Sequence, residues 1–156
     1  MKYFSVPELC ISSSHPSLVK IPEEGSVEYS NLVNLIENLL DPIRTALGQP
    51  ITVSSGYRPT ALNKAVGGSK TSNHLYGYAA DCHSTDNVKI IETLLSLGTT
   101  FDECIAEKAV FNKDGTLLSC KWVHLALRQS GNRSKLLFTT DGKNYHPLKW
   151  NVRLSK

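Results

Sequence analysis

The spacing of the hydrophobic residues predicts two amphipathic helices. In residues 29–47, apolar side chains recur every three or four positions, as they do along the buried face of a helix. These residues are Leu32, Leu35, Ile36, Leu39, Ile43 and Leu47. Pro42 lies within this run and predicts a kink or a break, whereas Gly48 is typical of a helix end. Residues 86–98 repeat the helical spacing, with Asp86 placed to cap the first turn.

Short apolar runs that are separated by turn residues predict β-strands. The predicted strands lie within "PITVSSGYRP", "YAADCH", "FDECIAEK" and "CKWVHLALR", and one or two helical turns are predicted within "TALNKAV". Two Asp-Gly pairs, at positions 114–115 and 141–142, are hairpin signals. The second pair predicts a C-terminal hairpin over residues 135–150.

The order of these elements predicts the fold class. Helices come early and hairpins come late, which is typical of α+β proteins. A chain of 156 residues is long enough to bury a hydrophobic core in one domain. We therefore expect a single domain over residues 1–156, in which helices flank a mainly antiparallel sheet.

Composition and charge exclude several kinds of partner. The chain has 17 basic and 14 acidic side chains, and no dense run of lysine and arginine supports binding to nucleic acid. No stretch approaches the roughly 18 apolar residues of a membrane helix, so we expect no membrane insertion. The start, "MKYFSVPELCISSS", lacks the apolar run of a signal peptide, so we expect synthesis in the cytoplasm and release by a separate route.

Cysteine usage argues against a zinc site built from thiolates. The four cysteines, Cys10, Cys82, Cys104 and Cys120, form no CxxC pair. We expect four reduced, mostly buried thiols. Cys82 follows Asp81 directly, which leaves open a contact with a site at that position.

Two histidines and one aspartate are candidates for a metal site. His74, Asp81 and His124 offer two imidazole nitrogens and a carboxylate oxygen, which suits a catalytic zinc whose fourth position is left for water. Strand alternation places His124 on the same face as Trp122 and Ala126. A histidine in that position is either a core residue with a polar partner or a metal ligand. Spacing alone leaves both interpretations open, and the same holds for Gly77, which lets the backbone pass close to a site or forms a simple turn.

A resemblance to a known family favours the metal site. The stretch "SNHLYGYAAD" carries Ser72, His74, Gly77, Ala79 and Asp81, with two residues between His74 and Gly77. It resembles the signature of the zinc D-alanyl-D-alanine metallopeptidases, which include bacterial carboxypeptidases, dipeptidases and phage endolysins, and which share a fold with the hedgehog signalling domain. The stretches "YFSVPEL", "SSGYRPTALNKAVGGSKTSNH", "FDECIAE" and "WVHLAL" follow in the order of this family, so the resemblance covers about residues 3–128.

The resemblance implies roles for individual residues. His74, Asp81 and His124 match the three zinc ligands. Arg58 matches an arginine that holds the substrate, a task that suits a planar guanidinium because it pairs with a carboxylate or supports a developing oxyanion. We also expect Ser72 to bind substrate, although a serine in a turn explains it equally well.

Three tyrosines near these motifs are candidates for lining the cleft. They are Tyr57, Tyr76 and Tyr78. Of the three, Tyr76 is the one that we expect to bind substrate. Packing within the domain is the alternative for each of them.

The general base departs from the family pattern. Family members place an acidic residue three positions before the last zinc histidine, and here that position is Lys121. Glu107 is the other candidate, because pairing of its strand with that of His124 would place it near the metal. The alternatives for Glu107 are a partner of a zinc histidine or a solvent-facing residue. Asp102 and Glu103 are weaker candidates.

Together, these matches imply a zinc-dependent hydrolase that cuts D-alanine-containing peptide bonds. The implied partner is a peptidoglycan stem peptide, and the implied setting is the bacterial cell wall, for a phage-type or a bacterial enzyme. We expect a monomer. Lys121 keeps open the alternative of a zinc-binding pseudoenzyme that binds cell-wall peptide without cutting it.

Overall fold

A six-stranded sheet organises the protein in the computed structural model, which describes residues 1–150. The strand order is β1-β2-β6-β3-β7-β8, and all pairings are antiparallel except β3 with β7. The strands are β1 (Thr52–Ser55), β2 (Ala79–His83), β3 (Glu103–Glu107), β6 (Trp122–Ala126), β7 (Lys135–Thr139) and β8 (His146–Pro147). The predicted α+β class with a mainly antiparallel sheet is therefore confirmed. Residues 151–156 of the expected domain lie outside the described residues.

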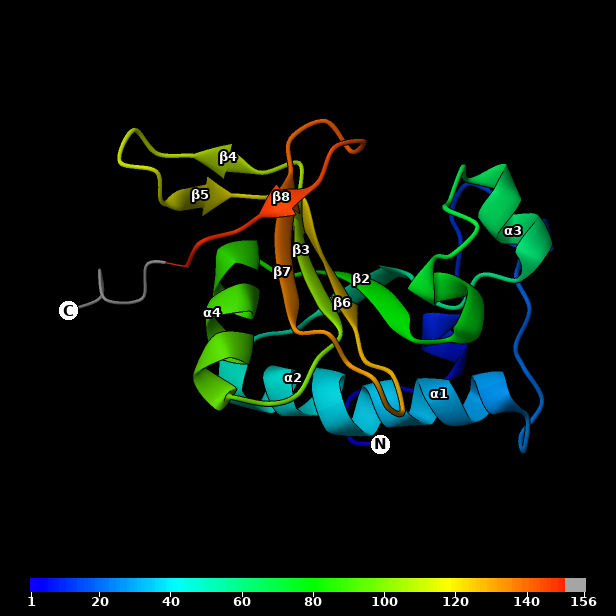
Figure 1. Cartoon of the computed structure of the whole chain (residues 1–156). Coiled ribbons are helices and arrows are strands. Elements are labelled where there is room, and N and C mark those ends of the chain that lie inside the picture. Colours follow the sequence, from blue (N-terminus) through cyan, green and yellow to red (C-terminus); the bar gives the residue numbers. More distant parts are fainter. Residues whose placement is uncertain (151–156) are drawn as a thin grey trace.

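The first predicted helix is one continuous helical run that changes its winding before the proline. It consists of α1 (Val27–Leu35), a π-helical segment η3 (Ile36–Leu40) and α2 (Asp41–Leu47). Pro42 lacks the N–H that an α-helix needs at this point, and a π segment is one way for a helix to accommodate such a residue. Figure 1 shows α1 and α2 following each other along one side of the molecule. The run ends at Gly48, which has the left-handed φ of +70°.

The other helices follow their expected signals. In α4 (Asn87–Leu97), the Asp86 carboxylate accepts a hydrogen bond from the Val88 N–H, and the helix ends at a left-handed Gly98. A short helix α3 (Thr60–Ala65) fills the stretch "TALNKAV". Three 3₁₀ segments complete the set: η1 (Pro7–Leu9), η2 (Pro16–Leu18) and η4 (Asn73–Tyr76). None of the helices in residues 1–150 is long and apolar enough to cross a membrane.

Both predicted hairpins are present. The first consists of β4 (Val110–Phe111) and β5 (Leu117–Ser119), which form a separate two-stranded sheet around Asp114-Gly115. The second pairs β7 with β8 around Asp141-Gly142. Because β7 also pairs in parallel with β3, this second hairpin extends the main sheet.

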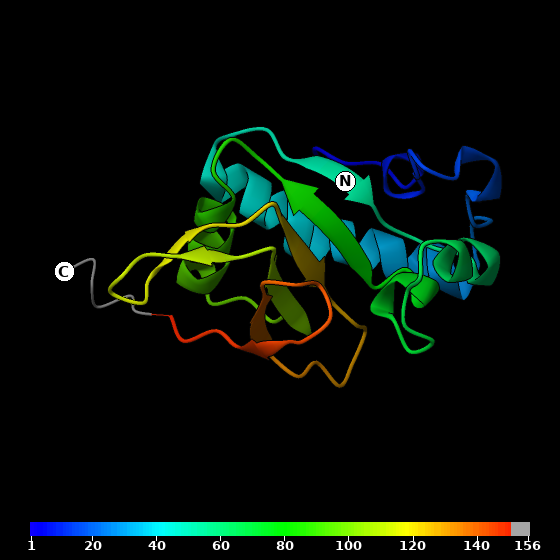
Figure 2. The same cartoon turned by 90° about the horizontal axis from the view of Figure 1, so that it is seen from above.

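One face of the sheet packs on the helices and forms the core. In Figures 1 and 2, α1, α2 and α4 lie on one side of the sheet, and α3 lies at the end of the molecule away from α4. The core face of the central strands is built from small and apolar side chains, all fully buried: Ala80, Cys82, Cys104, Ala106, Val123 and Leu125. All four cysteines are free and buried, as expected. Cys82 belongs to this core face, so it points away from Asp81 and the open contact is not made.

The opposite face of the same strands carries the polar residues. Strand alternation places Asp81 on this face of β2, Glu103 and Glu107 on β3, and His124 on β6. In the registers, His124 is the partner of Asp81 on one side and of Ile105 on the other. The fold therefore brings acidic and imidazole side chains from three strands to one place.

Candidate metal centre

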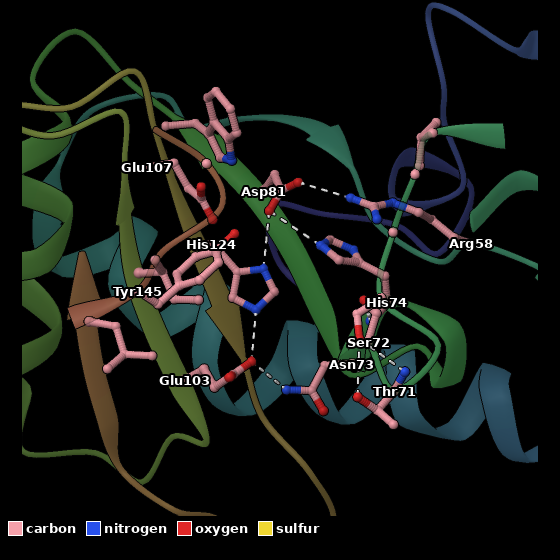
Figure 3. Close-up of a pocket in the computed structure, with 18 of the residues that line it drawn as sticks. Arg58, Thr71, Ser72, Asn73, His74, Asp81, Glu103, Glu107, His124 and Tyr145 are labelled. Carbon is pink, nitrogen blue, oxygen red and sulfur yellow. Dashed lines mark hydrogen bonds and ion pairs between the residues drawn. The ribbon is translucent and has the colours of Figure 1, made fainter. Parts of the chain in front are cut away.

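Three donor atoms converge on the polar face of the sheet. Asp81 Oδ1 lies 3.3 Å from His74 Nε2 and 3.2 Å from His124 Nδ1. The ligand atoms of the three residues all lie within 4.8 Å of one another, and all three residues are buried. Asp81 and His124 are neighbours because β2 pairs with β6, and His74 reaches them from η4 (Figure 3).

A backbone carbonyl fixes the proton on the first histidine. His74 Nδ1 lies 2.7 Å from the Gly56 carbonyl oxygen. Because a carbonyl only accepts hydrogen bonds, Nδ1 carries the proton and the lone pair on Nε2 faces Asp81. Burial lowers the pKa of His74, which favours this neutral form. A buried nitrogen lone pair that faces a carboxylate is unfavourable unless a cation lies between them.

A carboxylate fixes the second histidine in the same way. His124 Nε2 lies 3.1 Å from Glu103 Oε1, and the hydrogen bond from His124 lowers the pKa of Glu103. Despite its burial, His124 has a pKa raised to about 9, because its hydrogen bonds with Asp81 and Glu103 favour the charged ring. A divalent cation would replace the proton that faces Asp81. Two imidazoles whose outer nitrogens are hydrogen-bonded, together with one carboxylate, form a donor set that fits zinc.

Arg58 contacts the outer oxygen of the aspartate. Its Nη2 lies 3.4 Å from Asp81 Oδ2, while its Nε donates to Ser55 Oγ and its Nη1 donates to Asn63 Oδ1. Although burial raises the pKa of Asp81, the neighbouring His74 and His124 hold it well below its ordinary range. The carboxylate is therefore ionised and available as a ligand. The expected contact of Arg58 with substrate stays a prediction.

The three ligands lie in a pocket with a volume of about 770 Å³. Arg58, Ser72 and Glu107 also line it, as does Tyr145 from the β7–β8 connection (Figure 3). Ser72 caps the start of η4, where its hydroxyl accepts a hydrogen bond from the His74 N–H. This serine therefore positions the metal ligand His74, and its expected contact with substrate stays a prediction.

Tyr76 does not line this pocket. It is about half exposed and lines a neighbouring hollow together with Tyr57 and Lys64. The left-handed Gly77 (φ +77°) ends η4 directly after Tyr76 and turns the chain towards β2. A Cβ at Gly77 would lie 2.8 Å from the Glu28 carbonyl oxygen, so the turn and the close approach to α1 both require glycine. The geometry therefore gives no support to the expectation that Tyr76 binds substrate at the metal.

The structure separates the two candidates for the general base. Glu107 is buried at the end of β3, lines the pocket, and has a pKa raised to about 7 by burial. Lys121 is exposed and is not among the residues that line the pocket. Glu103, a weaker candidate, instead accepts the hydrogen bond from His124. Glu107 thus stays the predicted base.

Asp102, a weaker candidate for the base, lies instead in a cluster of charged residues beside the ligands, and the sequence did not predict this cluster. The side chain of Asp102 is completely buried, and both Arg133 and Arg128 pair with it. Arg133 binds it with two hydrogen bonds, Nε to Oδ1 at 3.0 Å and Nη2 to Oδ2 at 2.7 Å. No motif signals this cluster, because Asp102 and the arginines become neighbours only when β3 pairs with β6 and β7.

We expect the folded protein to lose stability in acid when Asp102 becomes protonated. Although burial raises its pKa, hydrogen bonds from Arg133 and Asn73 lower it from 3.8 to about 2. A carboxyl whose pKa is lower in the folded state stabilises that state above its unfolded pKa. We therefore expect a contribution on the order of 2 kcal/mol that is complete above about pH 4 and disappears towards pH 2.

The measurement is urea unfolding of the wild type and Asp102→Asn at pH 7, pH 4 and pH 2.5. The difference in unfolding free energy should be largest at pH 7 and should shrink at pH 2.5. Glu24→Gln, at an exposed position, is the matched loss of an acidic residue and should show no such trend. An equal difference at all three pH values would contradict the prediction.

Gly56 joins the metal centre to the N-terminal segment. Its carbonyl fixes His74, and a Cβ at this position would overlap the Leu9 carbonyl group. The next residue, Tyr57, donates its N–H to the Leu9 carbonyl oxygen over 2.7 Å. Only glycine allows the two backbones to approach this closely.

Comparisons with known proteins agree with this site. The sequence model of the family described as Peptidase M15 matches residues 2–126. A stretch of 43 residues is 49% identical to the zinc D-Ala-D-Ala carboxypeptidase of Streptomyces albus G. This stretch is 27% of the present chain and spans only 17% of the length of that relative.

Proposed function

Because the chain belongs to the peptidase M15 family and brings together a donor set that fits zinc, we propose that it is a zinc metallopeptidase that hydrolyses D-alanine-containing peptide bonds of peptidoglycan. The observation that carries the proposal is the convergence of His74, Asp81 and His124 in a pocket that also holds a buried carboxylate and an arginine. The name of the Streptomyces relative, a zinc D-Ala-D-Ala carboxypeptidase, supports the choice of substrate. The proposed partner is a stem peptide of the cell wall.

The pocket residues divide the work of amide hydrolysis. His74, Asp81 and His124 would hold a zinc ion, which would supply the activation of a water molecule and the polarisation of a carbonyl group. Glu107 accepts the proton of that water and donates it to the leaving amine. Its pKa of about 7 suits both steps, because a group that titrates near the working pH both accepts and releases a proton readily.

Arg58 stabilises negative charge on the substrate near the metal ligands. Its guanidinium is held by Ser55, Asn63 and Asp81, so it is fixed before substrate arrives. A fixed positive group stabilises negative charge that develops on a substrate oxygen, since no reorganisation is needed during the reaction. We propose this role for Arg58, together with orientation of the substrate.

Mass spectrometry of purified muropeptides tests the proposal. The zinc-loaded protein is incubated with muropeptides of known structure, and the products are identified. New free D-alanine would indicate a carboxypeptidase, whereas separated stems or cross-bridges would indicate an endopeptidase. Unchanged muropeptides from several cell walls, with zinc bound, would overturn the proposal and favour a protein that binds cell-wall peptide without cutting it.

The position of Lys121 weakens this non-catalytic alternative. The alternative depends on Lys121, which stands where the family pattern has an acidic residue. Lys121 is exposed, while Glu107 lies in the pocket and leaves a carboxylate beside the ligands. We therefore propose an active enzyme at the bacterial cell wall, of phage or bacterial origin.

Removal of the metal should lower the thermal stability. A ligand that binds only the folded state stabilises it by about 4 kcal/mol when its free concentration is 1,000 times its Kd. For a domain of this size, that corresponds to a shift in Tm of about 8–16 °C. Differential scanning fluorimetry with and without a chelator should show this fall, and added zinc should reverse it.

His74→Ala provides the control for the thermal shift, because it lacks one ligand and should show no zinc-dependent change in Tm. A wild-type protein with the same Tm in zinc and in chelator would contradict the prediction.

A further inference from the structure

The geometry points to a binding subsite for a peptide carboxylate, which we propose is formed by Arg128 and Arg133. Both arginines line the pocket that holds the metal ligands. They lie beyond residues 2–126, the part of the chain that matches the family model, so the family match assigns them nothing. The inference rests on the proposed function and concerns the part of the substrate that Arg128 and Arg133 bind. We call the side of the pocket that these two arginines line the arginine wall.

The buried Asp102 holds both guanidinium groups in place. Arg133 pairs with it through two nitrogens, and Arg128 Nε lies 3.3 Å from Asp102 Oδ2. Arg128 Nε also donates to Asn73 Oδ1 over 3.0 Å. These contacts fix the two cations before a ligand binds, which lowers the entropic cost of recognition.

Pairing with Asp102 does not use all the donors of these arginines. Within residues 1–150, Nη1 and Nη2 of Arg128 and Nη1 of Arg133 have no hydrogen-bond acceptor. One arginine with two parallel hydrogen bonds is enough to pair a carboxylate, so the second arginine is not needed for Asp102 alone. The side chains of Arg128 and Arg133 are 31% and 38% exposed and both line the pocket, so a ligand in the pocket can reach these two side chains.

With zinc bound, the local charge would also favour an anionic ligand. The two arginines are balanced by Asp102 and Glu103, both on the same wall of the pocket. Glu103 is already engaged, since one of its oxygens accepts hydrogen bonds from His124 and Asn73. A zinc ion with its three ligands adds positive charge, because only one of those ligands is a carboxylate.

Short hydrogen bonds connect the arginine wall to the metal centre. From Arg128, the chain of contacts runs through Asn73 and Glu103 to His124, with lengths of 3.0, 2.8 and 3.1 Å. A carboxylate bound at the arginines would therefore lie in the same pocket as the reacting carbonyl. That carboxylate is either the C-terminal α-carboxylate of the peptide or an acidic side chain close to the cut bond.

Direct binding measurements test the subsite. An N-acetylated peptide that ends in D-Ala-D-Ala is compared with its C-terminal amide by titration calorimetry. The zinc-loaded protein carries Glu107→Gln, which prevents cleavage, and if cleavage persists the ratio of kcat/KM values gives the same comparison. A second pair, with D-glutamate or D-glutamine before the D-alanine residues and amidated C-termini, tests the side-chain source.

We expect the free acid of one pair to bind at least about 10-fold tighter than its neutral counterpart, since charge-assisted hydrogen bonds are lost in the neutral peptide. Arg128→Gln should reduce this ratio below about 3 while leaving the affinity for the neutral peptide unchanged. Arg133 still pairs with Asp102 in this variant, so the fold should persist. Lys113→Gln, at an exposed position outside the pocket, removes the same charge and should keep the full ratio.

Two results would overturn the subsite. In the first, the acid and the neutral peptide bind equally in both pairs. In the second, Arg128→Gln weakens both members of a pair to the same extent, which would indicate a purely structural role. Either result leaves the proposed hydrolysis intact, whereas discrimination between acid and amide without any cleavage of muropeptides would overturn only the hydrolysis.

Discussion

Replacement of His124 by alanine should remove the bound zinc and lower kcat/KM by about 10⁴-fold or more. The side chain supplies one of three donor atoms, and Asp81 would be left with a single imidazole partner. Without the metal, the pKa of the attacking water returns from about 7 towards 15.7, so the nucleophile is nearly absent at neutral pH. The measurements are metal analysis of the purified protein and the rate of peptide hydrolysis.

His83→Ala is the matched control for this variant. His83 lies two residues after Asp81 on β2, but it is exposed and does not line the pocket. It should keep about one zinc per chain and its full activity. A His124→Ala protein that retains zinc in stoichiometric amount would show that the three residues are not the metal site.

Replacement of Glu107 by glutamine should lower kcat by 10²–10⁴-fold and leave the zinc content unchanged. Glutamine has the shape of glutamate but cannot accept and release a proton, and positioned acid–base groups contribute about this factor. Glu107 makes no hydrogen bond to a metal ligand among the described residues, so its loss should not disturb the ligands. Steady-state kinetics together with metal analysis separate these two effects.

Lys121→Gln decides between the two candidates for the base. If Glu107 is the base, this variant should keep wild-type kcat, because Lys121 lies outside the pocket. The opposite pattern, with an active Glu107→Gln and an inactive Lys121→Gln, would assign the proton transfer to the lysine.

Local signals in the sequence predicted the secondary structure well. The helix ending at Gly48, the Asp86 cap and the two Asp-Gly hairpins each depend on a few neighbouring residues, so they can be read without knowing the fold. For the π segment before Pro42, the sequence predicts only a kink or a break. Its form depends on how the helix keeps its apolar face on the core while one hydrogen bond is missing.

In the candidate site, too, local patterns predicted some residues, whereas others become neighbours only through strand pairing. His74, Asp81 and His124 could be proposed from a motif and strand alternation, and the structure brings all three together. The contact of Glu103 with His124 and the cluster around Asp102 depend on the register of β3 with β6 and on its parallel pairing with β7. Those pairings join residues far apart in the chain, and no local pattern specifies them.

The close packing of Gly56 against Leu9 links metal binding to the attachment of the N-terminal segment. Attachment of the first ten residues to the domain holds the carbonyl that orients His74, so metal affinity and attachment of this segment must influence each other equally. Zinc would therefore protect the N-terminal peptide bonds from proteolysis and amide exchange. Conversely, loss of that segment would raise the dissociation constant for zinc without removing a ligand.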